Sequence, residues 1–247
     1  MLRHWRHLAK LSWVEMKIFL REPMGAVGTI LIPVVLFVVL GRFLGGQAKA
    51  PAFVSRELPI FVVIFTAIGA VLSLSTIVAI YRESGILKRL KATPLSPLVI
   101  LTTHVVVKLV LTSVTLALLF VAGRRFYSGS APPTPWSFFF GVILVSVSLL
   151  SLGFVLASVV RTARFAQPVG SILIYALLAI SGIFFPIQLL PEPWRVLALA
   201  SPLTHAVDLL RGLWTGAGWA SVWIAVLALL VNFVICTTLS ARIFRWE

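Results

Sequence analysis

The sequence predicts an all-α membrane protein with six transmembrane helices. Of its 247 residues, 60% are hydrophobic and only 11% are charged, whereas about a quarter of the residues in a soluble domain carry a charge. Stretches without Asp, Glu, Lys or Arg recur along the chain, and a helix needs about 20 mostly apolar residues to cross a bilayer. We therefore expect one membrane domain over residues 1–247, embedded in the lipid bilayer.

The apolar stretches set the expected spans. Three starts carry a hydroxyl residue before a proline, a pairing that suits the first turn of a helix: Ser96-Pro97, Thr134-Pro135 and Ser201-Pro202. The expected spans cover residues 24–42, 58–80, 98–122, 135–160, 165–187 and 217–241.

The basic residues predict the orientation. The formal charge is +14, from 21 Lys and Arg against 7 Asp and Glu, and in a soluble protein this excess would indicate nucleic-acid binding. Here the basic residues lie between apolar stretches, so we expect no nucleic-acid partner. With the N-terminus inside, inner segments hold 13 Lys and Arg and outer segments hold 7. The positive-inside rule then predicts a multi-pass protein of the inner (plasma) membrane with both termini in the cytoplasm.

The first 22 residues are amphipathic. At about 100° per residue, apolar side chains that include Trp5 and Trp13 form one stripe, and basic side chains form the adjacent one. This pattern predicts a helix in the membrane interface, with tryptophans at the acyl boundary and basic groups at the lipid headgroups. The alternative is a solvated basic tail. The expected interface residues are Trp5, Trp13, Arg3, Arg6 and Lys10.

Two other segments are too short or too broken to span. Residues 82–92 predict a short amphipathic helix in a cytoplasmic loop, suited to docking in the groove of a partner; an ordinary basic loop is the alternative. Residues 191–212 are interrupted by prolines and predict re-entrant helices on the outer side, shielded by protein or lining a pathway. There His205 and Asp208 are three residues apart, so a hydrogen-bonded pair, a metal site and a proton relay are alternatives.

Lys108 is the charged residue well inside an expected span, and His104 shares its helix face. We favour a position near the inner interface, reached by its long stem, over a place facing a pathway. The single cysteine, Cys236, lies in an apolar stretch and supports neither a disulfide framework nor a cysteine metal site.

Together, these segments resemble the ABC-2-type permease family, the membrane subunits of ATP-binding-cassette exporters. FLREPMG at residues 19–25 is similar to that family's approach to the first span. YRESGILKRLKATPLSP at 81–97 is similar to its cytoplasmic coupling segment, and residues 181–212 are similar to its most recognisable stretch. Tyr81 departs from the family, which more often has a charged residue there.

The resemblance implies roles for two sets of residues. The coupling segment would dock on the ATPase subunit through Arg82, Glu83, Gly85, Leu87, Lys88 and Arg89. The re-entrant helices would form an outer gate that includes Phe184, Phe185, Pro186, Pro191, Trp194, Pro202, His205, Asp208 and Arg211.

The sequence contains no phosphate-binding loop of the Gly-x-x-x-x-Gly-Lys-Ser/Thr type, so we expect a non-catalytic chain without a cofactor or metal of its own. ATP and Mg would bind to a separate ATPase subunit, present in two copies. Six spans enclose little space, so we expect two permease copies, as a homodimer or with a relative. The expected cargo is amphipathic or hydrophobic: a drug, a lipid-linked molecule or a glycan. An ion- or proton-coupled carrier and a membrane-embedded enzyme are the alternative functions.

Overall fold

A computed structural model describes residues 2–21, 25, 27–44, 46–86, 97–129, 131–160 and 162–243, and these residues form helices and no strand. The predicted all-α class is therefore confirmed. Five helices are long and apolar enough to cross a membrane, or six if a bent helix pair near the C-terminus counts as one span. The five are Ala52–Glu83, Thr102–Tyr127, Pro135–Val159, Ala163–Ile180 and Trp223–Ile243. The expected first span corresponds to a shorter apolar helix, Val27–Phe43.

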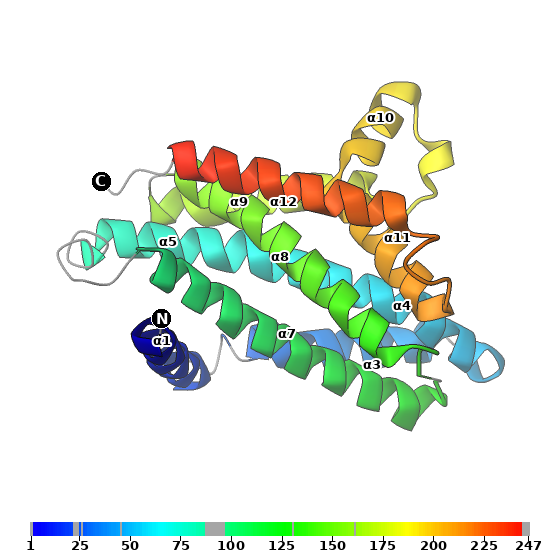
Figure 1. Cartoon of the computed structure of the whole chain (residues 1–247). Helices are drawn as coiled ribbons and strands as arrows, with labels where there is room; N and C mark the ends of the chain where they lie inside the picture. The colour runs from blue at the N-terminus through cyan, green and yellow to red at the C-terminus, as the bar shows by residue number, and fades with distance from the viewer. Residues whose placement is uncertain are drawn as a thin grey trace.

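Helix α1 (Leu2–Arg21) lies across one end of the bundle and packs against α7 (Pro97–Tyr127) (Figure 1). The next helical stretch begins with a wide π-helical turn, η1 (Val27–Leu31), and continues as α3 (Ile32–Leu44). The hydroxyl of Thr115 on α7 donates to the carbonyl of Thr29 at 3.2 Å, which joins this wide turn to α7.

The second span is one long helix with a π-helical turn inside it. It consists of α4 (Gly46–Ile68), η2 (Gly69–Ser73) and α5 (Leu74–Glu83). It ends at a turn in which Gly85 has φ 69°, a left-handed conformation that glycine adopts readily. Arg82 and Glu83 of the expected coupling helix thus form the last turn of α5, and residues 87–96, with Leu87, Lys88 and Arg89, lie outside the described residues.

Helix α8 (Pro135–Val159) is the central helix, and it packs against α12 (Trp223–Ile243), α5, η2 and α11. Polar groups reinforce the α8–α12 contact inside the apolar bundle. The amide of Asn232 donates to the carbonyl of Ser148 at 3.1 Å and to its hydroxyl at 2.9 Å. Buried leucines such as Leu149 and Leu229 surround this site, so the polar groups are paired where water cannot satisfy them.

Helix α9 (Ala163–Ile180) leads to a short 3-10 turn, η3 (Ile187–Leu189), and then to the bent pair α10 (Glu192–Ala200) and α11 (Pro202–Thr215). The pair bends by 66° at Ser201, whose hydroxyl accepts from the N–H of Leu203 and so caps α11. Most of the apolar side chains of α11 are buried, whereas α10 is largely exposed. This accords with the predicted re-entrant hairpin.

The helix ends divide into two groups. Helix α1, the end of α5 and the C-terminal end of α12 lie at one end of the bundle, and α10 and α11 lie at the other (Figure 1). Arg82 and Glu83 of the expected coupling segment, in the last turn of α5, and helices α10 and α11 of the expected gate are therefore at opposite ends of the molecule.

Candidate functional site

The last turn of α5 bridges two other helices. The guanidinium of Arg82 donates from Nη1 to the carbonyl of Val160 at 2.9 Å and from Nη2 to that of Ala157 at 3.1 Å. These carbonyls belong to the C-terminal turn of α8, where helical hydrogen bonding leaves acceptors unpaired. The carboxylate of Glu83 accepts from the backbone N–H of Ala163, the first residue of α9, at 3.0 Å.

We call these contacts of Arg82 with α8 and of Glu83 with α9 the Arg82–Glu83 bridge. In both of them the charge of the side chain is opposite to the partial charge of the helix end that it contacts. A cation at a helix C-terminus and an anion at a helix N-terminus each stabilise the helix dipole. The bridge therefore joins the end of α5 to the turn between α8 and α9.

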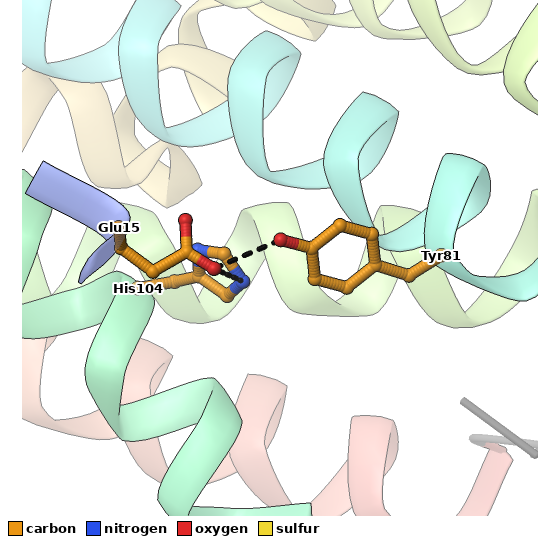
Figure 2. Close-up of polar contacts among 3 residues, drawn as sticks. All are labelled: Glu15, Tyr81 and His104. Atoms are coloured by element: carbon orange, nitrogen blue, oxygen red, sulfur yellow. Dashed lines mark hydrogen bonds and ion pairs between the residues drawn. The ribbon is translucent and has the colours of Figure 1, made fainter. Parts of the chain in front are cut away.

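A second polar contact joins α1 to the same region (Figure 2). The Tyr81 hydroxyl donates to Oε1 of Glu15 at 2.8 Å, and Nε2 of His104 lies 3.9 Å from the same oxygen. The rings of Tyr81 and His104 are 5.6 Å apart. Glu15 therefore connects α1 with both α5 and α7, and His104 is buried at this contact.

A cavity of about 510 Å³ opens beside this contact, and residues of α1, η1, η2, α5, α7 and α9 line it. Glu15, Tyr81 and His104 form one part of its wall. Other polar groups line it further along: Thr29, Ser73, Thr76, Lys108 and Gln167. The apolar lining consists of Ile18, Phe19, Leu72, Ile77, Ile80, Val107 and Leu111.

Lys108 does not extend toward the inner interface, so our favoured interpretation of this residue was wrong. Its ammonium nitrogen lies 3.9 Å from the position that a Cβ on Gly69 would occupy. At about 1.5 Å per residue, Gly69 is about 20 Å from Glu83, the end of α5. The stem points deeper into the bundle because α7 presents Lys108 to the cavity one turn beyond His104.

The expected interface helix has Lys10 and Trp13 exposed on α1. The Trp13 side chain is 63% exposed and lies 5.5 Å from the ammonium of Lys17. Side chains of Arg3, Trp5 and Arg6 lie outside the described residues.

The residues of the expected gate lie on α10, on α11 and in the turns before them. Phe184, Phe185 and Trp194 are exposed around η3 and α10. Pro186 precedes η3, Pro191 precedes α10 and Pro202 opens α11. Each proline stands where a helix begins, which is where its fixed φ is tolerated.

His205 and Asp208 do not form a hydrogen-bonded pair. The His205 ring donates from Nε2 to the carbonyl of Leu199 at 2.8 Å, and Thr204 donates to that of Ala198 at 2.6 Å. Both bonds hold the bend between α10 and α11. Asp208 is exposed, and Arg211 is half-buried. Within the described part of the chain, no group of three His, Cys, Asp or Glu side chains could hold a metal ion.

The helical membrane fold agrees with the comparison against protein families. The sequence matches the model of the ABC-2 type transporter family over residues 6–214. The chain belongs to the ABC-2 type transporter family. It is a multi-pass membrane protein and the permease domain of such a transporter. No curated protein matches this sequence.

Sequence reasoning about this ABC-2 permease missed Glu15 and the neutral polar lining of the cavity. Glu15 is the single acidic residue of α1, on a helix whose other charged residues are basic, and that isolation was the signal that could have found it. Tyr81 stood out only as a departure from the family pattern. Its bond to Glu15 gives the departure a physical role.

We expect Tyr81→Phe to weaken the contact of α1 with α5 and so to lower the stability of the permease. The change removes the hydroxyl that donates to Glu15, and a hydrogen bond to a charged group contributes about 1.5–3 kcal/mol. At about 2–4 °C per kcal/mol, the melting temperature in detergent should fall by several degrees. Tyr175→Phe is the matched control because Tyr175 is 60% exposed on α9. Equal melting temperatures for the two variants would contradict the assignment.

Proposed function

We propose that this chain is the permease subunit of an ATP-driven exporter that moves an amphipathic or hydrophobic cargo out of the cytoplasm. The observation that carries the proposal is the Arg82–Glu83 bridge, in a chain that belongs to the ABC-2 family. The bridge ties the residues expected at the ATPase contact to the start of α9 and the end of α8. Motion at one end of the bundle can thereby be passed along two spans toward α10 and α11.

The power source in this proposal is a separate ATPase subunit, in two copies, which binds ATP and Mg. The absence of a phosphate-binding loop from the sequence supports this division of roles. The ATPase would contact the segment that follows α5. Cargo could be a drug, a lipid-linked molecule or a glycan.

The transporter would contain two permease copies, as a homodimer. Helices α9 and α12 bury little of their surface within one chain, 22% and 17% of their most apolar windows. Large apolar side chains such as Phe165 and Ile172 are exposed on α9. These surfaces suit lipid or a second copy, and their extent supports a pathway shared between two chains.

Coexpression with the cognate ATPase tests the proposal. Purification should yield a complex whose mass corresponds to two permeases and two ATPases, and ATP should drive transport in sealed vesicles. A stable complex with one copy of each would contradict the dimer. Transport that persists without ATP and collapses with an ion gradient would instead support the carrier alternative.

Orientation can be tested with single cysteines, because the native Cys236 is buried. We expect Ser84→Cys, at the exposed end of α5, to react with an impermeant maleimide only from the cytoplasmic side. Ala217→Cys, in the exposed turn after α11, should react only from the outside. The reverse labelling pattern would overturn the proposed localisation of the termini.

A further inference from the structure

The side chain of Lys108 lines the cavity beside α1, and it takes no part in the Arg82–Glu83 bridge. We propose that this cavity binds an amphiphile whose headgroup has a net negative charge, a phosphate monoester or a carboxylate, and that the headgroup lies at Lys108. The binding itself does not depend on the proposed export. It assigns a ligand class to a site formed by α1, η1, η2, α5, α7 and α9.

The first support is the missing counter-charge. Among the described residues, none forms an ion pair with Lys108, and the residue lies in the candidate span Thr102–Tyr127. Charged side chains within a membrane are costly and are normally paired or functional. Glu15 is engaged by Tyr81 and His104, one helical turn away along α7. An anion from outside the chain would supply the missing partner.

The second support is the arrangement of neutral donors. Hydroxyls of Thr29, Ser73 and Thr76 and the amide of Gln167 line the same cavity as Lys108. Phosphate and carboxylate oxygens accept several hydrogen bonds at once, and bonds to ionised acceptors are stronger than neutral ones. An ammonium that shares its cavity with several neutral donors suits one anionic headgroup.

The third support is the size and apolar character of the rest of the lining. A volume of about 510 Å³ lies within the range of about 300–1,000 Å³ that is usual for ligand sites. A lone inorganic anion would leave the apolar part of the wall against water. Ile18 and Ile80 line the cavity and are about half exposed, 48% and 46%. They form an apolar rim through which an acyl chain can pass from the bilayer.

The fourth support is the backbone. Both described π-helical turns contribute to this cavity, η1 through Thr29 and η2 through Leu72 and Ser73. Such turns are rare and occur frequently at functional sites. Here they come from different spans and meet at one cavity, so the irregular backbone coincides with the unpaired cation.

Native mass spectrometry of the purified full chain tests the inference, with phosphatidic acid and phosphatidylcholine of identical acyl chains as equimolar probes. We expect the wild type to retain one phosphatidic acid in preference to phosphatidylcholine. Lys108→Met should reduce that preference by about tenfold, and Lys108→Arg should keep it. Lys17→Met is the matched control, because Lys17 is exposed on α1 and its loss should leave the preference unchanged.

A second variant keeps the charge and removes the space. Thr76→Trp should reduce retention of both lipids, and a monodisperse gel-filtration profile would show that each variant is folded. Equal retention of the two lipids by the wild type, or an unchanged preference in Lys108→Met, would overturn the inference. Adding the ATPase and ATP distinguishes the source of the amphiphile. Release of the bound phosphatidic acid would identify a cargo, and its retention would identify a resident bilayer lipid. Either outcome requires that the lipid first occupies the site.

Discussion

Glu83→Ala is expected to lower ATP-driven transport by about tenfold while ATP hydrolysis continues. The substitution removes the carboxylate that accepts from the N–H of Ala163 at 3.0 Å. A charge-assisted bond of this kind contributes about 1.5–3 kcal/mol, or about a factor of ten or more in a coupled equilibrium. Because Glu83 is exposed to solvent, we expect the loss to lie at the lower end of that range, at about tenfold. Transport in vesicles and ATP hydrolysis by the same preparation measure the two quantities.

Two controls separate coupling from general damage. Glu83→Gln keeps an acceptor oxygen for Ala163 and should retain more transport than Glu83→Ala. Glu192→Ala removes an exposed acid at the other end of the bundle, where it pairs with Arg195 of its own helix at 3.6 Å, and should leave transport unchanged. Full transport by Glu83→Ala would count against a coupling role for the bridge.

Gly153→Ala is expected to cause a large loss of stability in the helix bundle. Gly153 lies on α8 against η2, and a Cβ at this position would collide with the carbonyl oxygen of Ala70 and lie 3.0 Å from its carbonyl carbon. Because the obstacle is backbone, a change of rotamer cannot relieve the collision. Overpacking costs about 1–3 kcal/mol, which corresponds to a fall in melting temperature of about 2–12 °C at about 2–4 °C per kcal/mol.

Gly28→Ala is the matched control for this prediction. Gly28 is also in a helical turn, η1, yet a Cβ added to it would have no atom of the described residues within 4 Å beyond its own helix. Alanine there should be neutral or should raise the melting temperature slightly, because glycine costs up to about 1 kcal/mol in a helix. A Gly153→Ala protein as stable as Gly28→Ala would show that α8 and η2 are further apart than the structure has them.

Apolar segment length was sufficient to predict the helical class, since uncharged runs of this length have few stable forms other than a helix in lipid. The bent pair was also predictable: the prolines from Pro186 to Pro202 interrupt the pattern at the places where η3, α10 and α11 begin. The start of α12 was harder to predict from the sequence. This helix begins at Trp223 instead of near residue 217, because the left-handed Gly216 and Gly218 form a turn first.

Contacts between segments distant in the sequence were not predictable. A hydrogen bond between His205 and Asp208 was expected because of their spacing, but His205 bonds to Leu199 because the 66° bend brings the end of α10 to it. Lys108 was expected to reach the interface because a long stem allows it. Hydropathy does not show in which direction a side chain points. The ammonium of Lys108 lies beside Gly69 because α7 packs against the second span with that face inward.

Local patterns of polarity, proline and charge were enough to define the helical class, the amphipathic first segment, the bent element before the last span and the family. Packing between the helices set which polar groups meet: Arg82 and Glu83 at the ends of α8 and α9, and Glu15 with Tyr81 and His104. Packing also turned Lys108 toward a cavity, where no described residue forms an ion pair with it. Those contacts depend on how each helix is rotated about its axis, and that rotation is set by the whole bundle.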